Sequence, residues 1–116
     1  MRILIVEDNP LIVEAMERAG EQLSLTADCA TDGWDAIEML ENERYDAIVI
    51  DTDIPRHSGF GVLTYLREVA DDLGNVIVMT SSDRDALRRK LQDPVHVIAK
   101  TDADLTEAVR SLARRS

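Results

Sequence analysis

The stretch that most constrains this chain is residues 47–55, Ala-Ile-Val-Ile-Asp-Thr-Asp-Ile-Pro. Four apolar residues, three of them β-branched, lead directly into Asp51, and a second carboxylate, Asp53, follows two residues later. A short continuous apolar run is typical of a strand buried on both faces, as in a parallel sheet. An acid at its end would lie at the carboxyl edge of the sheet, where open α/β folds bind their ligands. Because Asp and Pro are also ordinary turn residues, this stretch alone favours a solvated turn.

Strand-like apolar runs alternate with amphipathic helix patterns along the whole chain. Strands are expected at residues 2–7, 25–29, 47–51, 75–79 and 95–99. Helices are expected at residues 10–20, 35–43, 60–70 and 84–91, and after Asp102 or Asp104. Asn9 before Pro10 is a favourable helix start, and Asp83 is a suitable cap for the helix 84–91. Five such units predict one α/β domain over residues 1–116, a flavodoxin-like, doubly wound parallel sheet with strand order 2-1-3-4-5.

The composition indicates a single soluble domain. The chain has 116 residues, of which 45% are hydrophobic and 31% charged, and no apolar run is long enough to cross a bilayer. Its single cysteine, Cys29, cannot form an internal disulfide, and no secretory leader precedes the first strand, so we expect a cytoplasmic protein. The net charge of −10 argues against direct binding of nucleic acid by this domain.

Polar side chains follow four of the five predicted strands and should meet at one edge of the sheet. They are Glu7, Asp8, Asp51, Asp53, Thr80 and Lys100. Carboxylates a few ångströms apart repel by about 4 kcal/mol per pair at an effective dielectric constant of about 20, so the cluster needs a counter-charge. Oxygen ligands without His or Cys favour Mg²⁺ or a similar hard ion. The ion and the lysine together could neutralise a phosphoryl group, and an aspartate could be its nucleophilic acceptor.

The chain resembles the receiver domain of two-component response regulators along essentially its whole length. Several motifs at the family's spacing carry this resemblance. They are Leu4 to Asp8, Ala30 to Gly33 with Ala36 and Ile37, Asp51 to Pro55 with Gly59, Val78 to Ser81, and Lys100.

The resemblance implies a metal-dependent phosphoacceptor. Asp51 would accept the phosphoryl group. Asp8, Asp51 and the backbone carbonyl of Asp53 would hold Mg²⁺ or Mn²⁺, and Glu7 would assist through water. The phosphoryl group would come from a histidine kinase or a histidine phosphotransfer protein, with small phosphodonors as a further source, and autodephosphorylation would remove it.

The resemblance also implies which residues contact the phosphoryl group. Thr80 would bind it and shift on phosphorylation, and Lys100 would pair with it. The backbone amides of Thr52 and Ser81 would complete the contacts. Val97 stands three positions before the lysine, where receivers usually carry an aromatic switch residue, and the proline that often follows the lysine is also missing. The relay from Thr80 is therefore expected to differ from the usual one.

The resemblance implies output through the face formed by the helix 84–91, the strand 95–99 and the last helix. Four basic residues lie on this face, Arg84, Arg88, Arg89 and Lys90. They are either a solvated helix surface or a contact with a partner protein, an output domain or a second copy of the chain.

Three alternatives remain open from the sequence. Ile50 to Asp53 also resembles the first motif of haloacid-dehalogenase-like phosphatases, with Asp51 as nucleophile and Asp53 as general acid, although the chain is short for that family. A Mg²⁺-dependent nucleic-acid module of the Toprim type would leave Thr80 and Lys100 without a role. A receiver that no longer switches and serves as a fixed docking module is the third alternative, and Val97 supports it.

Overall fold

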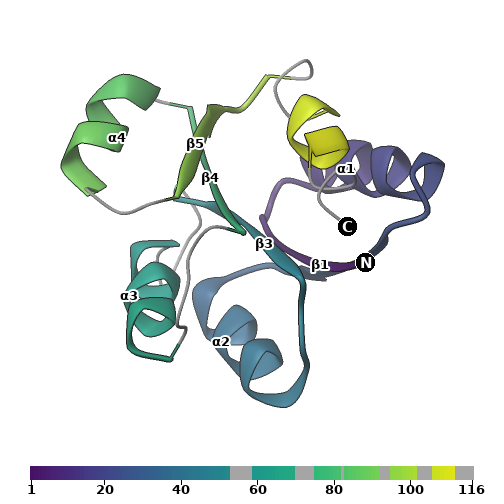
Figure 1. Cartoon of the computed structure of the whole chain (residues 1–116), viewed down its shortest axis with the longest axis horizontal. Helices are drawn as coiled ribbons and strands as arrows, with labels where there is room; N and C mark the ends of the chain where they lie inside the picture. Colours follow the sequence, from purple (N-terminus) through teal and green to yellow (C-terminus); the bar gives the residue numbers. More distant parts are fainter. Residues whose placement is uncertain (53–58, 70–74, 82, 92–94, 102–105, 112–116) are drawn as a thin grey trace.

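Five strands form one parallel sheet in the computed structural model, which describes residues 1–52, 59–69, 75–81, 83–91, 95–101 and 106–111. The strands are β1 (Arg2–Val6), β2 (Thr26–Ala30), β3 (Ala47–Asp51), β4 (Val76–Thr80) and β5 (His96–Ala99). Their order is β2-β1-β3-β4-β5, so the predicted flavodoxin-like arrangement is confirmed (Figure 1).

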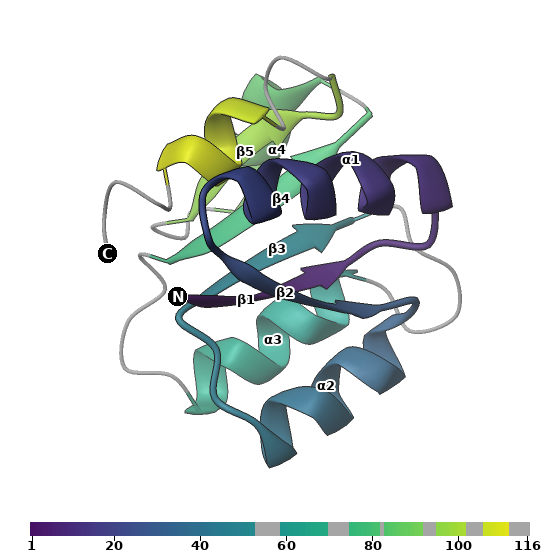
Figure 2. The same ribbon diagram turned by 90° about the vertical axis from the view of Figure 1, so that its right-hand side faces the viewer.

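Helices cover both faces of this sheet. The labelled helices are α1 (Pro10–Gln22), α2 (Gly33–Asn42), α3 (Gly59–Val69) and α4 (Arg84–Leu91), and residues 106–111 are also helical. The helix α1 and residues 106–111 pack on one face, and α2, α3 and α4 pack on the other (Figures 1 and 2). None of the described helices has the length and apolar character that a bilayer crossing requires.

The three central strands are buried on both faces, which explains why their sequences are continuously apolar. Successive side chains of a strand point to opposite faces, so each strand contributes to two cores. The core beneath α2, α3 and α4 takes Leu4, Val6, Ile48, Ile50, Val76 and Val78. The core beneath α1 takes Ile3, Ile5, Ala47, Val49, Ile77 and Met79.

Short polar side chains fix where the helices begin. Asn9 accepts a hydrogen bond from the Leu11 amide at 3.0 Å, and Pro10 occupies the first helical position of α1. Asp32 accepts one from the Asp35 amide at 2.9 Å, so α2 begins at Gly33, two residues before the predicted start. The helix α1 continues to Gln22, past the predicted stop near Gly20. The predicted caps of the last helix lie outside the described residues.

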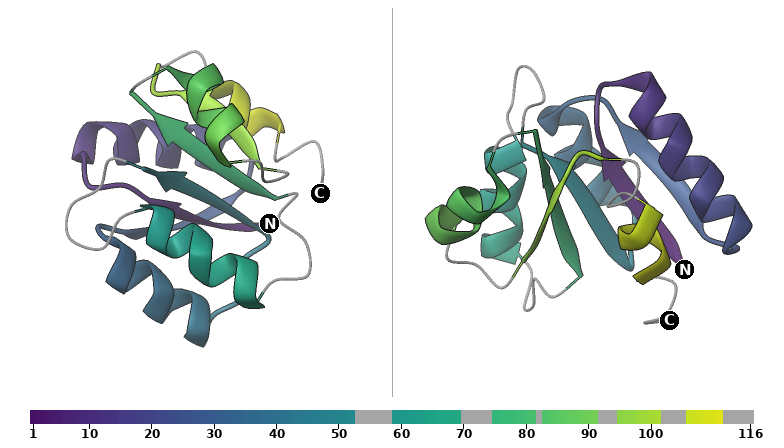
Figure 3. Two further views of the ribbon diagram at one scale, coloured as in Figure 1. Left: turned by 90° about the vertical axis from the view of Figure 1, so that its left-hand side faces the viewer. Right: turned by 90° about the horizontal axis from the view of Figure 1, so that it is seen from above.

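Because all five strands run in the same direction, the sheet has two chemically distinct edges (Figure 3). We call the edge where β1, β3 and β4 end the carboxyl edge, and the edge where they begin the amino edge.

Candidate functional site

Asp51 is the last residue of β3 and lies at the centre of the carboxyl edge. Its strand pairs with β1 on one side and β4 on the other, and Asp51 is 0% exposed. The ammonium group of Lys100 lies 2.6 Å from Asp51 Oδ2, and the same nitrogen lies 3.5 Å from Glu7 Oε2. One cation thus faces two buried carboxylates.

The end of β4 positions Lys100. The Lys100 backbone amide donates to the Thr80 carbonyl at 3.1 Å, because β5 pairs with β4 up to Ala99, the residue before the lysine. Thr80 is the last residue of β4 and is buried, whereas Ser81, which follows it, is exposed. Thr80, which is predicted to bind the phosphoryl group, therefore lies at a strand end adjacent to the one that Lys100 follows.

Thr52 follows Asp51 directly and is bonded to the neighbouring strand. Its backbone amide and its hydroxyl both donate to the Met79 carbonyl at 3.2 Å. A phosphoryl contact by the Thr52 amide would have to replace the first of these bonds.

Glu7 follows β1 and is completely buried, whereas its neighbour Asp8 is exposed at the rim of the site. Glu7 Oε1 accepts hydrogen bonds from the backbone amides of Asp8 at 3.2 Å and Asn9 at 3.0 Å. Within the described part of the chain, the buried Oε2 has no hydrogen-bond partner. One carboxylate oxygen from each of Glu7, Asp8 and Asp51 lies within 4.8 Å of the other two.

Burial raises the pKa of Glu7 from 4.5 to about 7. The hydrogen bond from the Asn9 amide and the charge of Lys100 oppose this rise in pKa, and the adjacent Asp51 carboxylate adds to it. Near neutral pH the site therefore carries more negative charge than Lys100 balances, and part of the excess is relieved by protonation of Glu7.

These residues fit a hard divalent cation. The three clustered carboxylates are all oxygen donors, and the buried Glu7 Oε2, 3.5 Å from the Lys100 ammonium, has no hydrogen bond among the described residues. Mg²⁺ and Mn²⁺ accept such donors, and a bound dication would favour the ionised form of Glu7. Asp53, whose carbonyl was predicted as a further ligand, lies outside the described residues.

A family model described as "Response regulator receiver domain" matches residues 3–110. The chain belongs to this family. The response regulator MprA of Mycobacterium ulcerans is 37% identical over 83 residues, which is 72% of this receiver domain and 35% of that protein. The chain therefore spans about a third of the length of the curated relatives it matches.

Solved receiver domains have the same fold. The receiver domain of the Francisella response regulator 1452 superposes with a TM-score of 0.81 at 23% identity, over 98% of this chain and 97% of that one. The receiver domain of a signal transduction histidine kinase from Syntrophus aciditrophicus gives a TM-score of 0.78 at 28% identity, over 98% and 90% of the two chains.

The position of the usual aromatic switch residue is filled by a buried valine in this receiver domain. Val97 is 2% exposed and packs in the core beneath α2, α3 and α4. Its carbonyl accepts a hydrogen bond from Arg88 Nη2 at 3.3 Å. Valine has no large ring that could move between core and surface, so a relay through an aromatic rotamer cannot operate at this residue.

The predicted output residues lie on α4. Arg84, Arg88, Arg89 and Lys90 are exposed on α4, which packs beside β5. Sequence reasoning missed the role of Asn9, whose amide holds Glu7 Oε1. The signal was present, because Asn9 follows Glu7 by two residues and begins a helix whose first amides are free to bond a carboxylate.

Proposed function

We propose that this receiver domain is a phosphorylation switch in which Asp51 accepts a phosphoryl group from a histidine kinase or a histidine phosphotransfer protein. The observation that carries the proposal is the Lys100 ammonium 2.6 Å from a completely buried aspartate, beside two further carboxylates at the end of β1. Membership of the receiver family supports the same role.

The transfer is a displacement at phosphorus. An Asp51 carboxylate oxygen attacks the phosphorus of a phosphohistidine, and a new O–P bond forms as the N–P bond breaks. The electron pair of that bond goes to the imidazole nitrogen, which takes up a proton from solvent. Lys100 remains beside the acyl phosphate and balances part of its charge, because its backbone amide is fixed to Thr80.

Glu7, Asp8 and Asp51 would hold Mg²⁺ or Mn²⁺ at this site. The bound ion would supply positive charge that neutralises the phosphoryl oxygens. Glu7 would present Oε2 to the ion, because Oε1 is already bonded to two backbone amides. Asp8, at the exposed rim, would close the ligand set on the solvent side.

Hydrolysis would reset the switch. A water oxygen attacks the phosphorus, the bond between Asp51 and phosphorus breaks, and inorganic phosphate leaves while the carboxylate is regenerated. Ser81 lies at the solvent-exposed side of the same strand end as Thr80, where its amide could bind the phosphoryl oxygens before release.

Output would pass through α4, β5 and the helical residues 106–111. The exposed basic residues of α4 would then meet an output domain, a partner protein or a second copy of the chain in a homodimer. We expect the protein in the cytoplasm, because response regulators are generally cytoplasmic. The phosphatase alternative gains no support from the relatives, which are response regulators and receiver domains.

Intact-mass analysis tests the proposal. Incubation with acetyl phosphate and Mg²⁺ should add one phosphoryl group, and beryllofluoride should form the corresponding adduct. Asp51→Asn should abolish both. The matched control is Asp46→Asn, which removes an exposed carboxylate at the amino edge and should leave both reactions intact. An unmodified wild-type chain under both conditions would contradict the switch, and a modified chain whose α4 and β5 amide resonances do not change would identify a fixed docking module instead.

A further inference from the structure

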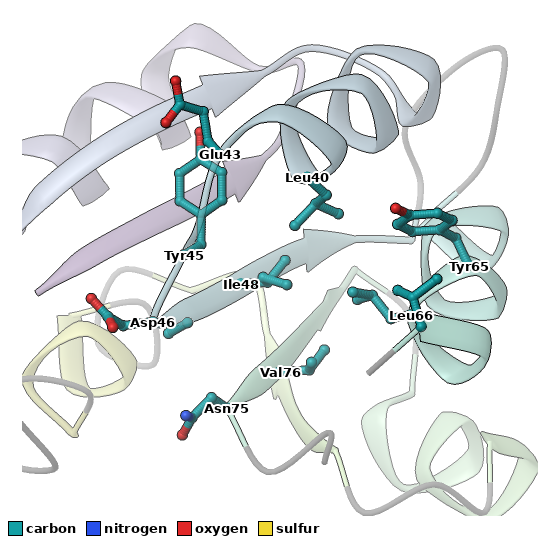
Figure 4. A pocket seen from close by; sticks show the side chains of 11 residues that line it. Leu40, Glu43, Tyr45, Asp46, Ile48, Tyr65, Leu66, Asn75 and Val76 are labelled. Atoms are coloured by element: carbon teal, nitrogen blue, oxygen red, sulfur yellow. The ribbon is translucent and has the colours of Figure 1, made fainter. Parts of the chain in front are cut away.

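A pocket opens at the amino edge, where the strands begin, whereas the acidic site lies where they end. It lies between α2 and α3, over the beginnings of β3 and β4, and has a volume of about 260 Å³ (Figure 4). Its lining is mixed: the apolar part is formed by Leu40, Ile48, Tyr65, Leu66, Val69 and Val76, and polar side chains, Glu43, Asp46 and Asn75 among them, line the rest.

The size of the pocket suits one large apolar side chain. Sites for drug-sized molecules usually measure about 300–1,000 Å³, whereas a cavity of about 150 Å³ already holds benzene. The pocket opens to solvent beside one apolar side chain, because Val69 lines it and is 58% exposed. A preformed pocket that opens to solvent can receive an anchoring side chain of a partner protein.

The rim of the pocket is acidic. Glu43 and Asp46 line it on the side where β3 begins, as Figure 4 shows. The Arg2 guanidinium bonds Glu43 at 3.0 Å and also Asp28 at 2.7 Å, so its single charge is shared between two carboxylates. Asp46 accepts a hydrogen bond from the Arg2 backbone amide at 2.8 Å, but among the described residues it has no cation within ion-pair distance.

We propose that this amino-edge pocket is a docking site for a basic segment of a partner protein, which inserts one large apolar side chain and places an adjacent Lys or Arg against Asp46 and Glu43. The apolar walls select the inserted side chain, and the uncompensated rim carboxylate selects the cation. The inference is independent of phosphoryl transfer, because none of its residues belongs to the carboxyl edge.

Amide chemical-shift titration of the whole ¹⁵N-labelled chain tests this docking site. The probe is the capped tripeptide Lys-Phe-Lys, with Lys-Ala-Lys and Glu-Phe-Glu as matched controls for the ring and for the charge. The probe should bind with a dissociation constant on the order of 1 mM, a modest value expected for so small a ligand, and should shift the amides of Ile48, Leu66 and Val76. Each control peptide should bind at least fivefold more weakly.

Two variants of equal charge separate the pocket from general attraction to an acidic protein. Val69→Lys places a cation at the mouth of the pocket and should weaken binding at least fivefold, whereas Leu11→Lys, at an exposed position on α1, should change it less than twofold. Asp46→Asn should reduce the advantage of Lys-Phe-Lys over Glu-Phe-Glu by about threefold.

Three results would overturn the proposal. They are equal affinity for the three peptides, an unchanged affinity in Val69→Lys, and tighter binding of free 2-phenylethylammonium than of the peptide, which would identify a small molecule as the occupant.

Discussion

Each edge of the sheet holds a cation that faces carboxylates, Lys100 at the carboxyl edge and Arg2 at the amino edge, but in the described part of the chain only the carboxyl edge leaves a buried carboxylate oxygen without a hydrogen bond. At the amino edge, Arg2 bonds Asp28 and Glu43 through its guanidinium and Asp46 through its backbone amide. The Tyr45 hydroxyl donates to Asp28 as well, and the Arg2 guanidinium lies 5.2 Å from the centre of the Tyr45 ring. Each of these carboxylates is bonded and reaches solvent.

At the carboxyl edge two carboxylates, those of Asp51 and Glu7, are held out of water. Lys100 faces Asp51 and Glu7, both buried, and Glu7 Oε2 is left without a hydrogen bond among the described residues. Burying excess charge costs free energy, so a fold that needed only a stable edge would use the arrangement around Arg2. The number of charged groups therefore does not distinguish a functional site from a structural cluster, whereas burial and a buried acceptor without a hydrogen bond do.

Removing the cation should separate the two edges most clearly. Lys100→Met removes the cation that faces the buried carboxylates of Asp51 and Glu7 and should lower the free energy of unfolding by about 4 kcal/mol in Mg²⁺-free buffer. Arg2→Met should cost much less, because its partners remain solvated. Urea unfolding of the two variants measures the difference, and equal losses would contradict the distinction between the edges.

The second largest difference between the two edges should be in how their carboxylates make stability depend on pH. The folded chain retains the Glu7 proton up to a pKa of about 7, whereas the unfolded chain releases it near 4.5. Stability should therefore fall as the pH rises through this window, by as much as about 3 kcal/mol. Glu7→Gln should remove this fall in stability. Glu43→Gln, which replaces an exposed carboxylate at the amino edge, should preserve it. Thermal unfolding from pH 4.5 to 8 without Mg²⁺ provides the measurement.

Divalent cations should stabilise the folded chain by binding at the carboxyl edge and not at the amino edge. Mg²⁺ at ten times its dissociation constant should raise the free energy of unfolding by about 1.4 kcal/mol if it binds only the folded chain. Asp8→Asn should remove most of this gain, because Asp8 closes the carboxylate cluster at the rim. Asp46→Asn should retain it. A gain that persists in Asp8→Asn would place the ion elsewhere.

The smallest effect concerns the satisfied cluster at the amino edge. The Tyr45 hydroxyl bonds Asp28 at 2.7 Å and is the main cause of the lowered pKa of Asp28, and the pKa of Tyr45 itself is raised to about 12, chiefly by burial. Tyr45→Phe should lower stability by about 1 kcal/mol above pH 5, and the loss should shrink as the pH falls and Asp28 is protonated. Tyr65→Phe is the matched control, since the Tyr65 hydroxyl has no hydrogen-bond partner within the described ranges.

The sequence predicted the fold well because periodicity and capping are local signals. Continuous apolar runs identified the central strands, Asn9 identified the start of α1, and the predicted helix at Arg84–Leu91 is confirmed. The start of α2 was predicted two residues late because Gly33 and Trp34 are weak helix signals, and the Asp32 cap decides the boundary.

The candidate site was predictable in its membership but not in its energetics. Strand ends converge in any parallel sheet, so Asp51 and Lys100 could be expected to meet. Glu7 and Asp8 are neighbouring acids in the sequence, and nothing in the sequence around them indicates that one is buried and the other exposed. The cluster around Arg2 was also invisible, because Arg2, Asp28 and Tyr45 are distant in sequence and look like ordinary surface residues.

The turn between β1 and α1 has a consequence for the choice of ion. Because the amides of Asp8 and Asn9 occupy Glu7 Oε1, Glu7 can give a cation only a single oxygen. Calcium commonly takes both oxygens of a carboxylate within a shell of six to eight ligands, whereas magnesium prefers one oxygen from each acid and completes an octahedron with water. These two backbone hydrogen bonds would therefore disfavour calcium relative to magnesium at this site.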